Sequence, residues 1–296
     1  MHTTPPPPFD VAAALPPVAP YARTTVRLHP RPGAPTAAQS SMGGPLLWPA
    51  EEPWPACDGP AGAEHLDGTD VVPVVPVLQL YAADVPELPF PDGADVLQVL
   101  WCPSDHDPWT SPLPRLFWRD SAAVTGPLAT APASDPEADG ERRPDTCVLD
   151  PERVLEYPDW DLPDAARDEI RDAIRALARD TGWEYDHDLA TASGTKVGGY
   201  PGWTQLPDWP ECACGRRMEH LLTVASWEFS NGYERRWITV EDRPAMAGWG
   251  FDAAPDHPWR RLQNPAGIML GDAGGIYLFV CLACPGRPYE YRFDCG

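Results

Sequence analysis

The chain has 296 residues, enough for one large domain or two ordinary ones, and carries a net charge of −22. Such an acidic surface repels phosphate backbones, so the composition argues against nucleic-acid binding and suits a basic protein partner better. No apolar run approaches the length of a membrane span, so no membrane association is expected. The N-terminus lacks the features of a secretory signal, and eight cysteines then favour a reducing cytoplasm, where close cysteine pairs favour metal over disulfide.

The first 120 residues are predicted to form a tail and a first β-rich unit. Residues 1–22, rich in Pro and Ala, are expected to be a disordered or extended tail. Hydrophobic patterning predicts strands over 23–29, 96–101 and 116–118. Residues 71–80 form an apolar run that contains two prolines, which favours an edge strand over a central one. The first unit therefore covers 23–120.

The second half begins with a linker and one helix. Residues 121–147 are dominated by Ala, Pro and acidic residues and are predicted to be a linker. Within a connecting segment over 148–190, apolar residues recur at helical spacing from Ala166 to Leu177, with Pro163 suited to the first turn and Gly182 to the end. The predicted helix spans 163–179.

Strand patterns return in a second unit over 191–296. Strands are expected over 221–226, 236–240, 276–280 and 289–293.

An internal repeat relates the two units. Residues 43–57 align without a gap to 198–212, and the matched residues are Gly43, Gly44, Trp48, Trp54 and Cys57 in one copy and Gly198, Gly199, Trp203, Trp209 and Cys212 in the other. Cys102-Pro103 aligns with Cys284-Pro285, and 114–120 with 288–294. The repeat predicts an α+β, mostly β fold in which two diverged copies of a β-rich module form one pseudo-symmetric domain, with a helix before the second copy.

The repeated residues have ordinary structural roles. Paired glycines allow backbone angles or close approaches that a Cβ would block, and tryptophans supply large apolar area. We favour this structural interpretation over a ligand groove shared between the copies.

These motifs resemble a known family. Ser41-Met-Gly-Gly-Pro-Leu-Leu-Trp-Pro, followed by Trp54-Pro, resembles the signature of YwqG-like bacterial proteins, whose function is unknown. So does the stretch from Lys196-Val-Gly-Gly-Tyr-Pro through Cys-x-Cys-Gly to Gly-Asp-x-Gly-Gly-Ile-Tyr-Leu-Phe, which is also similar to the eukaryotic programmed-cell-death-2 proteins. The resemblance implies a duplicated β-rich fold and carries over no catalytic residue. Eukaryotic relatives escort a ribosomal protein, and bacterial relatives have been proposed as immunity proteins beside toxins.

Two close cysteine pairs indicate a metal site. Cys212 and Cys214 form a Cys-x-Cys-Gly motif, and Cys281 and Cys284 form a Cys-x-x-Cys motif. Four thiolates in a tetrahedron are a common structural zinc site, and we predict structural zinc here, with packed reduced thiols or disulfide chemistry as alternatives. The first copy retains only the single matches Cys57 and Cys102, predicted to be buried small hydrophobes after loss of its site.

Three further groups have weaker claims to chemistry. Cys147 and Cys295 are potential spare ligands. The acidic run Glu184, Asp186, His187 and Asp188 could bind a metal, although a solvated loop is the commoner outcome. Lys196, the one lysine in the chain, follows Ser-Gly-Thr but lacks a true phosphate-loop motif, and it is noted as a possible groove residue.

Two functions remain open at this stage. We favour a non-enzymatic, cytoplasmic protein, chaperone-like or immunity-like, that binds a basic protein partner. The alternative is an enzyme, hydrolytic or RNA-processing, with a site in the groove between the repeats. Convergent carboxylates around Lys196 would favour the enzyme, and an exposed apolar or acidic patch would favour the binding protein.

Overall fold

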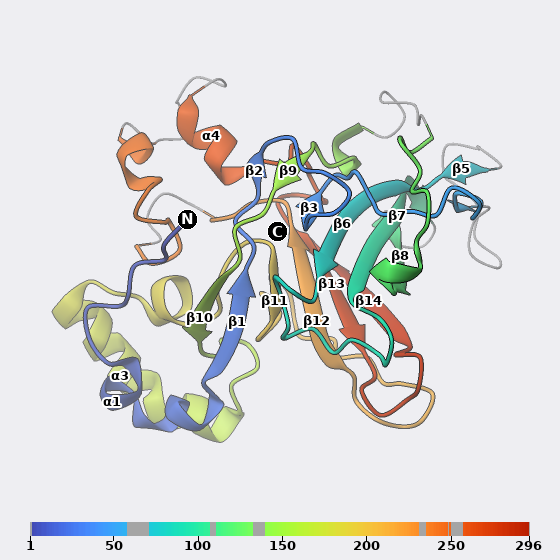
Figure 1. Cartoon of the computed structure of the whole chain (residues 1–296). Coiled ribbons are helices and arrows are strands. Elements are labelled where there is room, and N and C mark those ends of the chain that lie inside the picture. Colours follow the sequence, from blue (N-terminus) through green and yellow to red (C-terminus); the bar gives the residue numbers. More distant parts are fainter. Residues whose placement is uncertain are drawn as a thin grey trace.

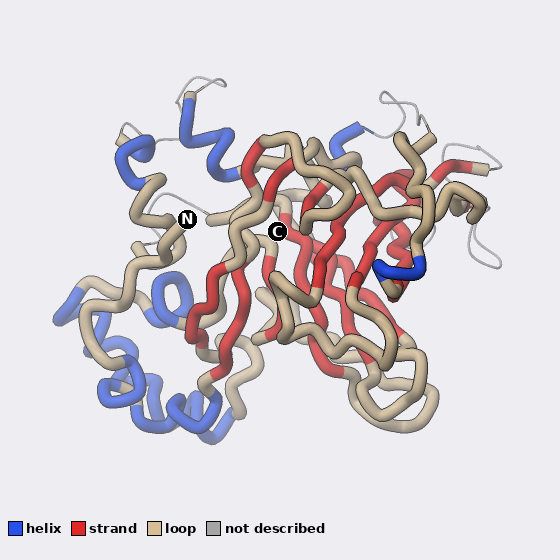
Figure 2. The backbone as a smooth tube through the Cα atoms, viewed as in Figure 1, coloured by secondary structure: helices blue, strands red, loops and turns tan. Residues whose placement is uncertain are grey.

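The computed structural model describes residues 2–57, 71–106, 111–132, 140–230, 235–247, 249 and 257–295. Two six-stranded antiparallel sheets dominate the architecture, with helices at the periphery (Figures 1 and 2). One hydrophobic core contains residues of both sheets, among them Val26, Leu78, Leu97, Val197 and Leu278. The prediction of a mostly β, α+β fold is therefore confirmed.

The sheet built mainly from the first half of the chain is called the N-sheet. Its strands, in spatial order, are β2 (Arg31–Pro32), β9 (Cys147–Val148), β3 (Ser41–Met42), β6 (Val75–Tyr81), β7 (Val96–His106) and β8 (Ser111–Arg119). A separate two-stranded sheet pairs β4 (Ala56–Cys57) with β5 (Val72–Pro73).

The sheet built mainly from the second half is called the C-sheet. Its strands, in spatial order, are β10 (Glu152–Glu156), β1 (Arg23–Arg27), β11 (Lys196–Gly198), β12 (Glu219–Ala225), β13 (Gly275–Val280) and β14 (Tyr289–Asp294).

The chain crosses between the two sheets twice. It leaves the C-sheet after β1 to form β2 at the edge of the N-sheet, and it leaves the N-sheet after β9 to form β10 at the edge of the C-sheet. The remaining four strands of each sheet follow one another in chain order, as β3, β6, β7 and β8 or as β11 to β14. One side of each sheet is therefore formed by two strands from opposite ends of the first half of the chain, β2 and β9 in the N-sheet and β1 and β10 in the C-sheet.

The pairing registers of the two sheets also correspond. β6 is irregular between Pro76 and Leu78, and β12 between His220 and Leu222. With these bulges aligned, Cys102 falls on the place of Cys281 rather than Cys284, which corrects the match drawn from the sequence.

The strand registers differ by one residue from the sequence alignment of 114–120 with 288–294. Arg119 pairs with Val96, and Asp294 pairs with Gly275 at the corresponding place. The hairpin loops before β8 and β14 differ in length, and a slip of one residue reverses which face every side chain occupies.

The apolar run over 71–80 is predicted to be an edge strand, and this prediction is wrong. β6 lies between β3 and β7, so it has a neighbour on both sides. Pro76, which cannot donate a backbone hydrogen bond, is accommodated at the bulge that follows it.

The N-terminal segment is ordered over its described residues, 2–22, so the prediction of a disordered tail over 1–22 is wrong for them. Residues 11–21 form α1 (Val11–Ala14), capped by the Asp10 side chain, and the 3₁₀-helix η1 (Pro16–Tyr21). Val11, Leu15 and Val18 are buried against the longest helix, α3 (Asp164–Thr181). Helical spacing of these three apolar residues outweighs the surrounding prolines.

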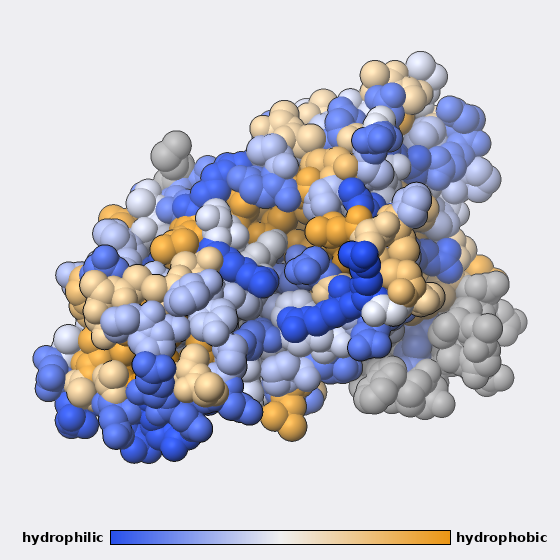
Figure 3. Space-filling model, turned by 90° about the horizontal axis from the view of Figure 1, so that it is seen from below, coloured by the Kyte–Doolittle hydropathy of each residue, from blue (hydrophilic) through white to orange (hydrophobic). Residues whose placement is uncertain are grey.

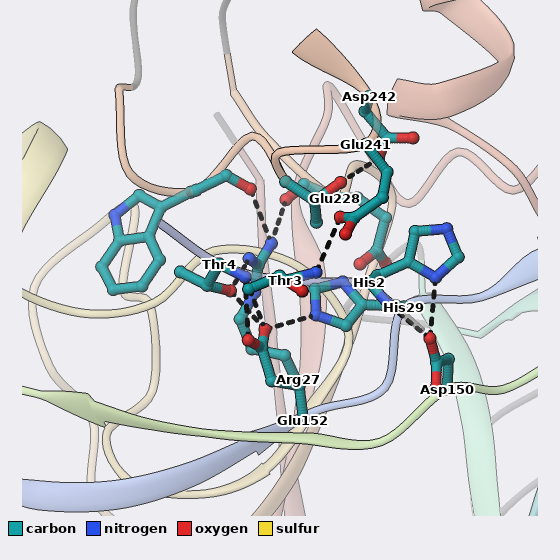
Figure 4. Close-up of polar contacts among 12 residues, drawn as sticks. His2, Thr3, Thr4, Arg27, His29, Asp150, Glu152, Glu228, Glu241 and Asp242 are labelled. Atoms are coloured by element: carbon teal, nitrogen blue, oxygen red, sulfur yellow. Dashed lines mark hydrogen bonds and ion pairs between the residues drawn. The ribbon is translucent and has the colours of Figure 1, made fainter. Parts of the chain in front are cut away.

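Polar contacts fix the chain ahead of α1 (Figure 4). The Thr4 backbone N–H and hydroxyl both donate to Glu152, and the Thr3 N–H donates to Glu241 at 2.8 Å. The hydroxyl of Thr4 also accepts a hydrogen bond from Arg27 at 2.9 Å. This segment therefore connects the first strands of the C-sheet to the 239–242 turn.

Helix α3 confirms the predicted helix. It begins after Pro163 and ends at Gly182, whose φ of 71° is the left-handed conformation expected of a C-terminal glycine. The shorter helical segments are η2 (Ser121–Ala123), η3 (Gly140–Arg142), the π-helix η4 (Tyr185–Leu189), η5 (Arg243–Met246) and α4 (Pro258–Gln263).

Two further expectations need correction. The predicted linker over 121–147 includes structure in its described part, because Cys147 is buried in β9 between β2 and β3. The segment 236–240 consists of turns rather than a strand. Its Trp237 is buried, its carbonyl accepts a hydrogen bond from Arg27, and its ring lies near the same guanidinium.

Within the described part of the chain, no helix is both long and apolar enough to cross a membrane.

Candidate metal centre

Sheet pairing brings the two cysteine motifs together. Cys212 and Cys214 precede β12, whereas Cys281 and Cys284 follow β13. β12 and β13 run antiparallel, with Glu219 opposite Val280, so the start of one strand meets the end of the other. Residues far apart in sequence therefore face each other at one end of the C-sheet.

Tight turns shape both loops. In the first loop, the Cys212 N–H donates to the Arg216 carbonyl and the Gly215 N–H donates to the Cys212 carbonyl, both at 2.8 Å. Gly215 has φ +78°, a conformation that favours glycine. In the second loop, the Cys281 N–H donates to the Pro288 carbonyl at 2.9 Å, which closes the turn around Cys284.

The four sulfurs have the spacing of a metal site. Sγ of Cys212 lies 3.8 Å from Sγ of Cys284, and Sγ of Cys214 lies 3.7 Å from Sγ of Cys281. All four lie within 4.8 Å of one another. A tetrahedron with zinc–sulfur bonds of about 2.3 Å has sulfur–sulfur edges of about 3.8 Å. The four predicted ligands are thus brought together in an arrangement that can hold a metal ion.

The cysteines share protons unevenly when no cation is bound. Burial raises the pKa of the Cys281 thiol, but hydrogen bonds from the Ala283 backbone and from Cys212 outweigh burial and lower this pKa to about 7. Hydrogen bonding with Cys214 raises the pKa of the Cys284 thiol to about 12. A divalent cation would displace the remaining protons, because thiolates are the metal-binding form.

An aromatic cluster packs against the two cysteine loops. Trp203 stacks on Phe279 at 5.9 Å between ring centroids, and Trp209 meets Phe279 edge-on at 5.3 Å. Both indole N–H groups donate to the Asp161 carboxylate, at 3.1 and 2.5 Å. The Arg217 guanidinium lies 3.7 Å from the Trp209 ring centroid. The repeated tryptophans therefore hold the cysteine loops against the sheet, which agrees with a structural role.

The corresponding motif in the first half makes a similar cluster. Trp48 is buried, and its ring centroid lies 5.1 Å from those of Trp54 and Phe117. Cys57 is buried in the same cluster.

All four repeated glycines have positive φ, namely Gly43, Gly44, Gly198 and Gly199. A Cβ on Gly43 would come within 2.6 Å of the Asp145 carbonyl oxygen, so at least this glycine also permits a close approach.

Lys196 is part of a buried ion pair, and it also belongs to the lining of a cleft. Its side chain is 1% exposed, and its Nζ lies 2.8 Å from the Glu156 carboxylate, which is fully buried. The same carboxylate accepts hydrogen bonds from the Ala192 and Tyr200 backbone N–H groups. A Cβ on Gly199 would lie 1.9 Å from Glu156 Oε1, so the glycine makes room for this network.

The other suggested ligands do not join the centre. Glu184, Asp186 and His187 form a separate, exposed group. Asp188 is buried and accepts hydrogen bonds from the backbone N–H groups of Glu184 and Arg235. The buried Cys147 thiol donates to the Pro265 carbonyl. Cys295 contacts the Gln205 side chain at the chain end.

A cleft that the sequence did not predict lies on the outer face of the C-sheet. Its volume is ≈ 610 Å³, and buried Thr223 and Tyr277 belong to its lining. Three carboxylates also line it, those of Asp159, Asp186 and Asp272, together with the cationic side chains of Arg167 and Lys196. Burial, followed by the nearby charge of Asp186, raises the pKa of Asp159, as expected of carboxylates that crowd one another.

Aromatic side chains accompany these carboxylates in the cleft. Trp160, which is 39% exposed, and half-buried Trp227 contribute to its lining. Sequence periodicity gives no signal for this set, because its members come from separate segments spread over more than a hundred residues.

The chain was compared with known proteins, and it matches no protein-family model and no curated protein sequence.

Proposed function

We propose that this protein is a non-enzymatic binding protein whose cleft takes a basic segment of a protein partner. The carrying observation is that three carboxylates, those of Asp159, Asp186 and Asp272, line one cleft with an exposed indole, against two cations in the same lining, Arg167 and the paired Lys196. Arginine and lysine side chains pair with carboxylates and pack on indole rings, so this lining suits a basic segment. The net charge of −22 would speed encounter with such a partner.

Exposed apolar surface supports the same proposal. On the face seen in Figure 3, apolar side chains gather in a hollow between hydrophilic ones. Large apolar residues elsewhere are exposed as well, including Leu206 at 77% and Leu282 at 46%. Aromatic and aliphatic anchors carry most binding energy at protein interfaces, while charge sets the encounter rate.

The four-cysteine centre is proposed to hold structural zinc. Four thiolates leave no open position for a substrate, so zinc bound in this way stabilises the fold and does not catalyse. Reduced, metal-binding cysteines agree with a cytoplasmic location, which is part of the proposal.

The protein is also proposed to be a YwqG-like protein built by duplication. Equal strand order, matching bulges, and glycine pairs and tryptophans at corresponding places support two diverged copies.

The Lys196–Glu156 pair supports the binding role over the enzyme alternative. Lys196 belongs to the lining of the cleft that also holds the three carboxylates. Its side chain is 1% exposed, however, and its ammonium is paired with the buried Glu156 carboxylate, which also accepts two backbone N–H groups, so the ammonium is not presented to a substrate.

The proposal is tested by titrating the full chain with an arginine- and lysine-rich peptide and following tryptophan fluorescence. The double variant Asp159→Asn/Asp272→Asn should weaken binding about tenfold, or about 1.4 kcal/mol, because two charge-assisted contacts are lost. Rising salt should weaken binding by the wild type.

A matched control keeps the change in net charge but leaves the cleft intact. Asp168→Asn/Asp172→Asn removes two carboxylates from the exposed face of α3, where they are 66% and 96% exposed, and should bind the peptide like wild type. Equal weakening by both double variants would reduce the effect to general charge and contradict a cleft site. Binding of single-stranded RNA in preference to the peptide would favour the RNA-processing alternative.

A further inference from the structure

A second group of metal-ligating side chains lies in the first half of the chain. Cys57 and Cys102 are 0% exposed, and His106 is 4% exposed. Cys57 ends β4, whereas Cys102 and His106 belong to β7. Their sulfur and nitrogen ligand atoms all lie within 4.8 Å of one another. Two thiols and an imidazole thus converge from two sheets in a buried place.

The histidine is oriented as a ligand. Its Nδ1 lies 3.3 Å from the Ser111 carbonyl oxygen, which can only accept a hydrogen bond, so Nδ1 carries the proton. The lone pair of Nε2 then points toward the thiols, and Nε2 lies 3.5 Å from the Cys57 sulfur. Metal-binding histidines commonly donate their second ring N–H to a carbonyl in this way.

The distances agree with one shared metal ion. Zinc bonds of about 2.3 Å to sulfur and about 2.05 Å to nitrogen place the two ligand atoms about 3.6 Å apart in a tetrahedron. The observed separation of 3.5 Å between Cys57 Sγ and His106 Nε2 matches that value.

The position in the fold gives independent support. The gapless alignment puts Cys57 on Cys212, and the strand registers put Cys102 on Cys281. The group therefore occupies the place in the N-sheet half that the four-cysteine centre occupies in the C-sheet half. His106 lies beyond Cys102 on the same side as Cys284 lies beyond Cys281.

We infer that Cys57, Cys102 and His106 bind a second zinc ion. These three side chains are the protein ligands of the site, and the fourth position is left to water, as in other zinc sites with three protein ligands. This assignment replaces the sequence-based interpretation of Cys57 and Cys102 as mere remnants of a lost site. It does not depend on the proposed partner.

The test is the zinc content of the full chain, purified without chelators and measured by mass spectrometry. Wild type and the control Cys295→Ser should each hold two zinc ions. His106→Gln should hold one, and Cys284→Ser should hold one, because each removes a ligand from a different centre.

X-ray absorption on wild-type protein gives a readout that needs no variant. Two filled centres predict an average of about three sulfur ligands per zinc, with a nitrogen contribution, whereas the four-cysteine centre alone predicts about four. A wild-type chain that holds one zinc or none, with a content unchanged by His106→Gln, would overturn the inference.

Discussion

The two sheets hold the chain after their glycine pairs by different chemistry. In the C-sheet half, the Glu156 carboxylate accepts the Tyr200 N–H, and its charge is balanced by Lys196. In the N-sheet half, the Gln79 side-chain carbonyl accepts the Leu47 N–H at 2.7 Å. The acceptor for the backbone N–H is therefore a carboxylate in an ion pair in the C-sheet half and a neutral amide in the N-sheet half.

The neutral arrangement continues into a network. Gln98 donates to the Gln79 carbonyl at 2.8 Å, and the Gln98 carbonyl accepts from Arg119 at 2.7 Å. The strand registers place Ser41 opposite Gln79 where Lys196 is opposite Thr223. The comparison teaches that the two halves of one fold can satisfy backbone N–H groups near their glycine pairs with or without charge. The two solutions should differ in how much they cost to break.

The largest effect is expected from Lys196→Met. The variant leaves the Glu156 carboxylate buried without its counter-charge, which typically costs about 3–5 kcal/mol. Urea unfolding measures the loss. Arg153→Met is the control, because it breaks an exposed pair with Glu87 and should cost less than about 1 kcal/mol. Equal costs for the two variants would show that burial of the Lys196 pair has no energetic weight.

A smaller loss is expected from Gln79→Leu in the N-sheet. The variant strands the Leu47 N–H and the Gln98 amide but no charge, so we expect about 1–3 kcal/mol in the same urea experiment. Leu47 is only half-buried, so water can replace part of the lost contact. A cost above that of Lys196→Met would reverse the ranking of the two solutions.

The smallest effect is expected in the pH dependence of stability, where the bulge of β12 differs from that of β6. Burial lowers the pKa of His220, at the C-sheet bulge, to about 3, whereas Pro76 at the N-sheet bulge cannot titrate. The unfolded chain protonates this histidine below a pKa of about 6.5 and the folded chain does not, so stability should fall as pH drops below that value. The expected contribution is about 1.4 kcal/mol per pH unit.

Burial also lowers the pKa of His29, to about 4, which adds a similar slope until that pH is reached. Urea midpoints between pH 7 and 5 for wild type and His220→Gln measure the His220 share, because glutamine can still donate to Gly198 and accept from Thr223. An unchanged slope in the variant would mean that His220 titrates normally in the folded protein.

Local signals predicted the central strands and the long helix. β13 and α3 have apolar patterns that match their burial in sheet and helix, so periodicity was sufficient for them. The segment 236–240 has a strand-like composition, but its burial comes from tertiary contacts with Arg27 that no local pattern encodes. The first helix was missed because prolines dominate its surroundings, while Val11, Leu15 and Val18 are the residues that decide its packing.

The four-cysteine centre was predictable and the second group was not. Close cysteine pairs can be recognised in the sequence. His106 lies near Cys57 only because strands distant in sequence pack together in the fold. Lys196 stands out in the sequence as the one lysine, but its partner Glu156 lies on β10, which β1 separates from the strand of Lys196. Contacts of this kind depend on topology, which short motifs do not specify.

The crossing of the chain between sheets bears on how the protein is made. β1 pairs with β10 and β11, and Arg27 is opposite Lys196, so the first strand waits for about 170 more residues before both neighbours exist. At a synthesis rate of about 5–20 residues per second, this wait lasts on the order of 10 seconds or more. Closing so long a segment also slows folding once the chain is complete. The N-terminal strand therefore stays without its partners through much of synthesis, while its unpaired edges are open to wrong pairing.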